Sequence, residues 1–167
     1  MSRILRWTAM GAFIAGSSLV AAPLGAATTK SVVVADATVT AARANGNSAV
    51  ELTITNDSKG PISLTSVSSP VSAMSMIYYD ENMCQGNHTM AWLANIFIEP
   101  GHVQKLALKF QGAMLGELRS PLVKGSTVPL VLKWSNFQVA KSVTIEAKVI
   151  AAPKGLRFRM SAMNMKM

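Results

Sequence analysis

AVELTITNDSKGPISLTSVSSP (residues 49–70) contains two short segments of alternating apolar and polar side chains, joined by a cluster of turn-forming residues. The alternating segments are AVELTITN (49–56) and ISLTSVS (62–68), and NDSKGP lies at their junction. Val, Ile, Leu and Thr at a period of two are typical of half-buried β-strands, whereas Asn, Asp, Ser, Gly and Pro favour turns. This stretch therefore predicts two strands connected by a turn.

The same pattern continues on both sides of this stretch. Further strands are expected at SVVVADATVTA (31–41), VQKLALKF (103–110), TVPLVLKW (127–134) and VAKSVTIEAKVI (139–150). Turn-forming clusters separate them, among them ANGNS, EPGH and KGS. A set of about seven short strands over about 120 residues predicts an antiparallel β-sandwich or barrel.

The composition argues against several classes of function. The 167 residues suit one domain, and 16 Lys and Arg against 8 Asp and Glu give a net charge of +8. The basic residues are spread along the predicted strands and only 6% of residues are aromatic, which disfavours nucleic acid as a partner. The sequence has no Ser/His/Asp spacing, phosphate-binding loop or HExxH motif, so we do not expect an enzyme.

The N-terminus has the three parts of an export signal. MSRILR is charged, WTAMGAFIAGSSLV is apolar and APLGAA ends in small residues, so cleavage is expected after Ala27. A retained anchor is the alternative, although Gly, Ser and Pro interrupt the apolar segment and it is short for a spanning helix. We expect a signal peptide (1–27), a β-sandwich domain (28–152), a Met-rich basic tail (153–167), and a periplasmic mature chain without a membrane span.

Soft donor atoms are concentrated in MSMIYYDENMCQGNHTM (74–90), which contains four methionines, the only cysteine and one of two histidines. Cys84 has no cysteine to pair with, and it lies in a polar stretch that is typical of a loop. Two interpretations remain open: a metal site, or a strand and loop whose methionines fill a core. The tail methionines likewise predict either a thioether arm for a soft cation or an amphipathic segment packed on the sheet.

Other candidate residues have simpler expected roles. Met74 and Met76 alternate with small and apolar neighbours and are expected in the core, while Asp80 and Glu81 are expected at a charged loop tip. A blue-copper site needs two histidines with a cysteine and a weak axial methionine. Because the second histidine, His102, falls in the EPGH turn, we expect it to be exposed to solvent and do not expect an electron-transfer site.

From Ala41 to Val149 the chain resembles the periplasmic copper chaperone family PCu(A)C. The resemblance is carried by AVELTITNDSKGPISLTSVSSP, IFIEPGHVQKLAL, AMLGELRSPLVKGSTVPLVLKW and VTIEAKV. It implies an all-β fold, a cupredoxin-like antiparallel β-sandwich. The family's metal motif is His, ten residues, Met, twenty-one residues, then His-x-Met.

In this chain the resemblance preserves the two thioethers of that motif as Met90 and Met114. Gly112 stands where the second histidine is expected, and the first falls on Tyr78 or Tyr79. Neither glycine nor tyrosine replaces an imidazole as a ligand for Cu(I). From the residues alone, Met114 also suits a core position in a loop that returns to the sheet.

Two residues near Met90 can supplement the thioethers. His88 is two residues earlier, so in an extended strand it shares a face with Met90. Cys84 adds a thiolate, the softest donor in the chain. The predicted Cu(I) ligands are therefore Met90, Met114, His88 and Cys84.

Two functions follow from these observations. The resemblance implies a periplasmic copper chaperone that delivers Cu(I) to an envelope protein such as an oxidase assembly factor. The alternative is a metal-free β-sandwich that serves as a binding or structural module of the cell envelope after losing the family's site. Replacement of both motif histidines favours the alternative, whereas His88, Cys84 and the methionine tail favour copper.

Overall fold

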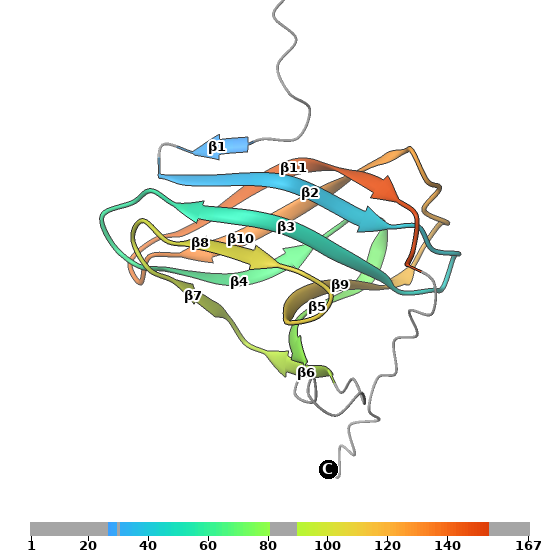
Figure 1. Cartoon of the computed structure of the whole chain (residues 1–167), viewed down its shortest axis with the longest axis horizontal. Helices are drawn as coiled ribbons and strands as arrows, with labels where there is room; N and C mark the ends of the chain where they lie inside the picture. The colour runs from blue at the N-terminus through green and yellow to red at the C-terminus, as the bar shows by residue number, and fades with distance from the viewer. Residues whose placement is uncertain (1–26, 30, 81–89, 154–167) are drawn as a thin grey trace, which may run out of the picture.

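The computed structural model describes residues 27–29, 31–80 and 90–153, and every regular element within them is a β-strand (Figure 1). The strands are β1 (Ala27–Thr29), β2 (Val32–Thr40), β3 (Ser48–Asn56), β4 (Ile62–Ser68), β5 (Ser72–Asp80), β6 (Met90–Leu93), β7 (Ile96–Ile98), β8 (Val103–Leu106), β9 (Gln111–Leu118), β10 (Thr127–Ser135) and β11 (Ala140–Ile150). The all-β class predicted from the alternating segments is confirmed.

The strands form one strongly curved sheet. Its hydrogen-bonded order is β6-β5-β9-β3-β2-β11-β10-β4-β7, with β1 added to β2 and β8 to β3. Neighbours are antiparallel except β11 and β2, which run parallel. Although β4 and β5 are far apart in this order, they also contact each other, so the sheet curls back on itself into a sandwich (Figure 1).

The core forms where the inner faces of the curved sheet meet. On β3, Val50, Leu52 and Ile54 are each 1% exposed, while Glu51 and Thr53 between them are half-buried on the other face. This period of two follows from strand geometry, and removal of the inward side chains from water is the main force that holds the two layers together. The alternation read from the sequence therefore assigns the inner face of β3 correctly.

Asn56, at the end of β3, ties several segments together. Its side-chain amide nitrogen donates hydrogen bonds to the carbonyl oxygens of Gly60 (3.0 Å) and Ile98 (2.8 Å). Its side-chain oxygen accepts from the Ser58 backbone N–H (3.0 Å) and the Ser58 hydroxyl (2.6 Å). Because Asn56 is 0% exposed, these bonds satisfy a buried amide and hold the β3–β4 turn against β7.

The expected strand at 103–110 is too long. Strand β8 ends at Leu106, and β9 begins at Gln111. Leu52 of β3 pairs with Leu106 and Val50 pairs with Ala113, so the four residues between β8 and β9 loop out from β3. Both strands use the same edge of β3, and a hydrogen bond from the Ala107 N–H to the Gln111 carbonyl (2.7 Å) closes the loop.

Two further expectations need correction. Met114 lies in strand β9 rather than in a returning loop. Met74 alternates with its neighbours as expected, but it is 37% exposed and is not a core residue. Ile77 points to the opposite face of β5 and belongs to the core cluster. The face that carries Met74 therefore points away from the core. The alternation along β5 was therefore predicted correctly, but the side of the strand that faces the core was not.

Candidate metal centre

Strand β5 lies between β6 and β9, and the register of these three strands brings the motif positions to one face. Tyr78 is opposite Gly112 on β9, and Met76 is opposite Met114. On the other side of β5, Asp80 is opposite Met90. Residues directly opposite in an antiparallel pair point to the same side of the sheet. We call this side, which carries Met74, Met76, Tyr78, Met90 and Met114, the methionine face.

The methionine face is separate from the core of the sandwich. Ala113 and Leu115, which flank Met114 on β9, belong to the core cluster. Met114 and Tyr78 are each 0% exposed, yet neither is part of that cluster. These two side chains are therefore buried on the opposite side of the sheet, in surroundings of their own.

Tyr78 fills the space above Gly112. A Cβ atom at position 112 would lie 2.6 Å from the Tyr78 Oη atom and 2.7 Å from its Cζ atom. Contacts this short do not occur between folded residues, so position 112 accepts only glycine while Tyr78 keeps this conformation. In the described part of the chain, the Tyr78 hydroxyl is buried without a hydrogen-bond partner.

The electrostatic surroundings of Tyr78 are negative. Burial, together with smaller contributions from the charges of Glu51 and Asp80, raises the pKa of the Tyr78 phenol from 10.0 to about 12. The phenol is therefore neutral at physiological pH and is not an anionic ligand there. The two carboxylates close to it favour a cation on the methionine face.

The structure brings some of the methionines together and keeps others apart. Met76 and Met114 are direct partners, which puts their Cβ atoms about 5 Å apart. Met90 and Met114 are separated by two strand spacings and by four residues along β5, which is about 10 Å across the strands and about 13 Å along them. In this register the thioethers of Met90 and Met114 are not neighbours.

Several residues singled out in the sequence lie outside the described residues. They are His88, Cys84, Glu81 and the tail methionines Met160, Met163, Met165 and Met167. His102 is described, and it is exposed in the turn before β8 as expected, with Nδ1 3.3 Å from the Pro100 carbonyl oxygen. Among the described residues, no three or more His, Cys, Asp or Glu side chains gather in a group able to hold a metal ion.

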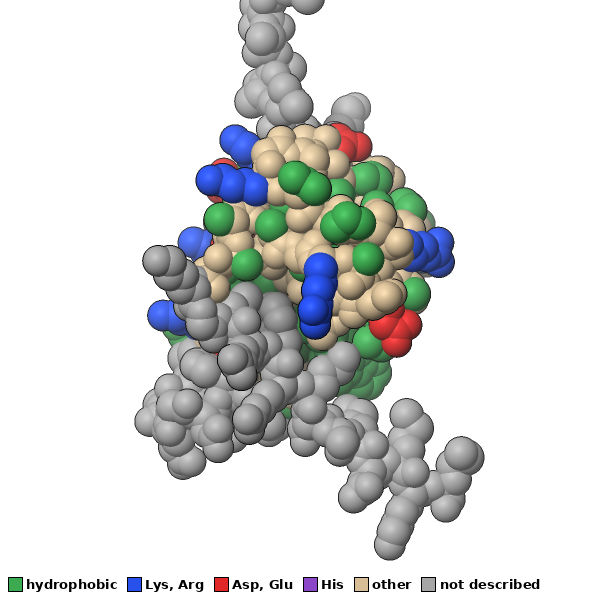
Figure 2. Space-filling view, turned by 90° about the vertical axis from the view of Figure 1, so that its right-hand side faces the viewer, with side chains coloured by type: hydrophobic (Ala, Val, Ile, Leu, Met, Phe, Trp, Pro, Cys, Tyr) green, Lys and Arg blue, Asp and Glu red, His purple; other side chains and the backbone are tan. Residues whose placement is uncertain are grey.

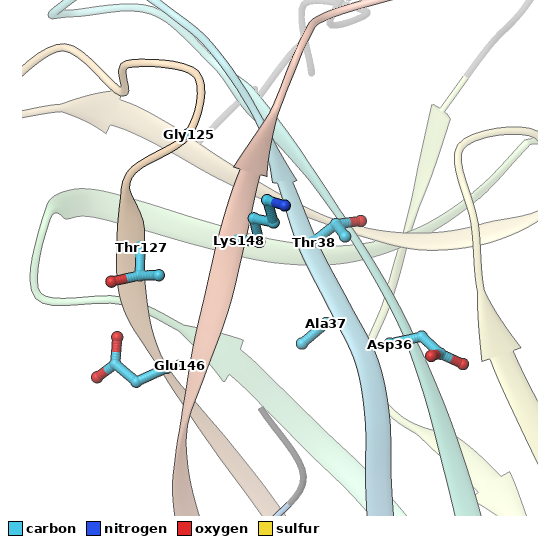
Figure 3. A pocket seen from close by; sticks show the side chains of 7 residues that line it. All are labelled: Asp36, Ala37, Thr38, Gly125, Thr127, Glu146 and Lys148. Carbon is cyan, nitrogen blue, oxygen red and sulfur yellow. The ribbon is translucent and has the colours of Figure 1, made fainter. Parts of the chain in front are cut away.

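A hollow lies elsewhere, over β2, β10 and β11 (Figure 3). It has a volume of about 500 Å³ and opens where β2 bulges at Asp36, whose φ is 54°. Asp36, Glu146 and Lys148 contribute its charged groups, and Ala37, Thr38, Gly125 and Thr127 complete the lining. Without sulfur or imidazole donors, this hollow does not suit a soft metal ion.

The basic side chains do not form one patch on the side of the molecule seen in Figure 2. Among the described residues visible there, Lys and Arg are scattered between polar and apolar side chains. The basic side chains of the described residues visible on that side are therefore dispersed rather than concentrated.

Comparisons with known proteins give a family and a fold. The LpqE-like family of lipoproteins matches residues 32–149. The copper-bound PCuAC domain from PmoF2 has a TM-score of 0.62 at 16% identity, covering 76% of this chain and 98% of that chain. The apo PCuAC domain from PmoF1 has a TM-score of 0.62 at 19% identity, covering 76% and 99%.

A third structure, the Cu(I) form of DR1885 from Deinococcus radiodurans, has a TM-score of 0.52 at 24% identity, covering 80% of this chain and 83% of that chain. No curated protein matches the sequence of this chain. At these identities the three structures establish the fold, which is the cupredoxin-like β-sandwich of PCuAC domains.

Proposed function

The chain belongs to the LpqE-like family, and from this premise we propose that it is a copper chaperone that carries Cu(I) as cargo in the periplasm. The observation that carries the proposal is the methionine face on a PCuAC-like sandwich. Two of the similar structures, the PCuAC domain from PmoF2 and DR1885, were solved with copper or Cu(I) bound. Thioethers are soft ligands and favour Cu(I) over harder ions.

We propose that the facing pair of Tyr78 and Gly112 replaces both motif histidines. Their direct pairing between β5 and β9 supports this assignment, because side chains at directly opposite positions can reach a single ion. A neutral, buried phenol over a glycine offers no nitrogen donor. Copper binding then depends on sulfur, with help from any imidazole nearby.

The proposed ligands are Met90 and Met114, joined by His88 and Cys84 from the segment before β6. A joint site for Met90 and Met114 requires Met90 to leave its pairing with Asp80. Met90 is half-buried and is the first residue of a four-residue strand at the edge of the sheet. Pairs at such strand ends open at low cost, so its thioether can move toward the other ligands.

Delivery is proposed to be an exchange of ligands with a copper-receiving envelope protein, such as an oxidase assembly factor. Neutral thioethers bind Cu(I) without an opposing charge, and Met90 lies half-buried on the edge strand β6, so a partner can displace the ligands one at a time, beginning with Met90. This role requires no catalytic residues. We propose accordingly that the chain is not an enzyme.

The proposed location follows from the N-terminal sequence. Residues 1–27 have the features of a signal peptide, and the domain itself is proposed to span 28–152, followed by the tail. No helix in the described part of the chain has the length and hydropathy needed to cross a membrane. The family is described as lipoproteins, but the only cysteine here, Cys84, is far from the expected cleavage point.

A metal-free β-sandwich module of the cell envelope is the second candidate. It is favoured by one observation: the Tyr78 ring fills the space above Gly112 in which a second imidazole would have to lie. In that case the methionines serve only as apolar packing.

Competition between the exported mature protein and a coloured Cu(I) chelator separates these two candidates. The chaperone is expected to take Cu(I) from the chelator and to bind Zn²⁺ much more weakly, because thioether is a poor ligand for zinc. His88→Ala is expected to weaken Cu(I) binding, with His102→Ala in the exposed turn as its matched control. Failure of the wild-type protein to compete with the chelator would leave the metal-free module as the function.

A further inference from the structure

We propose that Met74, Met76 and Met114 form a site in which Cu(I) is held by three thioethers on strands β5 and β9. The inference rests on the proposed function only for the identity of the ion. Met74 and Met76 are not part of the family motif, and their sequence pattern suggests core residues. The register of β5 and β9 is what groups them with Met114.

The three methionines are neighbours on one face. Met76 is directly opposite Met114, and Met74 is opposite Gly116, the next position of β9 on that face. Met74 and Met114 are therefore diagonal neighbours, with Cβ atoms about 7 to 8 Å apart. Methionine has three rotatable side-chain bonds, so three thioethers at these spacings can converge on one ion with Cu–S bonds of about 2.3 Å, the length known for zinc.

Gly116 provides the space for this convergence. A Cβ atom at position 116 would lie 3.0 Å from the Met74 Cε atom, so the end of the Met74 side chain already lies over the glycine beside Met114. The Asn47 side-chain oxygen lies 3.3 Å from the same point and adds a polar group to this side. A larger residue at 116 would push the Met74 thioether away from Met114.

The three methionine side chains differ in their exposure to solvent. Met74 is 37% exposed, Met76 is half-buried and Met114 is 0% exposed. An ion can therefore meet Met74 first and reach the buried Met114 by exchanging ligands. The buried end also lacks competing water, which favours a weakly hydrated cation such as Cu(I) over Zn²⁺.

The charge next to the three methionines suits a cation. Tyr78 and Gly112 form the neighbouring pair on this face, about 7 Å along the strand from Met76 and Met114. Glu51 and Asp80 lie close enough to Tyr78 to act on its phenol. Within a protein of net charge +8, two carboxylates at this position offset the positive charge of a bound Cu(I).

Methionine-to-leucine variants of the exported mature protein test the site, with Ile77→Leu on the opposite face of β5 as the matched control. Met76→Leu is expected to weaken Cu(I) binding in chelator competition by about tenfold or more, the size usual for a supporting change at a metal site. Ile77→Leu, whose side chain lies in the core on the other face of β5, is expected to bind Cu(I) as the wild type does. Leucine keeps the apolar volume, so the melting temperature of each metal-free variant is expected to stay near that of the wild type.

Methyl NMR identifies the ligands directly. In protein labelled at the methionine methyl groups and titrated with Ag(I), a soft and redox-inert probe, the signals of Met74, Met76 and Met114 are expected to shift together. If Met90→Leu loses Cu(I) while Met74→Leu and Met76→Leu bind as the wild type does, the three-methionine site is wrong and the motif ligands stand. If the wild type itself binds neither ion, the proposed copper function fails as well.

Discussion

The phenol ring of Tyr78 on β5 lies over the Cα atom of Gly112 on β9, its direct partner across the two strands. The two residues are complementary in size, because a Cβ atom at 112 would come within 2.6 Å of the tyrosine Oη atom. This pair occupies the centre of the methionine face, between Met90 on one side and Met114 on the other. The fit of a large side chain over a glycine has consequences for stability and for metal binding.

Gly112→Ala is expected to destabilise the protein by about 1 to 3 kcal/mol, because the added methyl group overpacks the space that the Tyr78 ring fills. The Ala107 carbonyl oxygen, 3.0 Å from the same position, limits movement on the other side. Urea unfolding in the Tyr78→Ala background supplies the control, since the cost of Gly112→Ala is expected to be clearly smaller there, with only the Ala107 carbonyl oxygen still close to the new methyl group. Equal costs in both backgrounds would mean that the clash is not with Tyr78.

Tyr78→Phe is expected to stabilise the protein by about 1 kcal/mol at neutral pH, because it removes a buried hydroxyl that has no hydrogen-bond partner among the described residues. Chemical unfolding of the variant against the wild type measures this difference. Tyr79→Phe, at the next position of β5, is the matched control for loss of a phenolic hydroxyl. A clear loss of stability in Tyr78→Phe would show that the hydroxyl has a partner.

The stability of the wild type is expected to fall in alkali. The pKa of Tyr78 is raised from 10.0 to about 12, so the unfolded chain loses this proton at lower pH than the folded protein does. The associated stability is complete below pH 10 and is lost as the pH rises toward 12, on the order of 2 kcal/mol. Tyr78→Phe is expected to lose less stability over this interval, as measured by unfolding at a series of pH values.

The double variant Tyr78→His and Gly112→His is expected to bind Cu(I) more tightly than the wild type, because it puts two imidazoles at facing positions beside the thioethers. Chelator competition measures the gain. Gly112→His alone is expected to be poorly folded, since Tyr78 still fills the space. Tyr79→His with Gly112→His, made in the Tyr78→Ala background to clear the space over position 112, tests the other possible alignment. A tighter site in that variant instead would move the motif position to Tyr79.

Asn56→Ala is expected to cost about 3 kcal/mol, because it removes the side-chain hydrogen bonds to Gly60 and Ile98 and leaves the buried Ile98 carbonyl without this donor. Thermal and urea unfolding both report the loss. Ser58→Ala removes only one partner of the Asn56 oxygen and is expected to cost much less. Similar costs for the two variants would assign the effect to the turn alone.

The strands of this protein were predictable because the burial of alternate side chains is a local property. The segments at 49–56 and 62–68 differ from the observed β3 and β4 by one residue at most. The strand predicted at 103–110 was too long because its apolar run continues through Leu108, where the four residues that loop out between β8 and β9 interrupt the pairing with β3. Such a loop depends on the partner strand, and the alternation does not record it.

The residue types on the candidate site were likewise visible in the sequence, since Met90 and Met114 stand at motif spacing and Met74 and Met76 precede Tyr78 at a period of two. Only the tertiary structure decided which of them are neighbours. Cross-strand register places Met76 opposite Met114 and Tyr78 opposite Gly112. It also places Met90 opposite Asp80, four residues along β5 from the partner of Met114. The physical reason is that alternation fixes the face of a strand, whereas the closure of the whole sheet fixes the residue opposite.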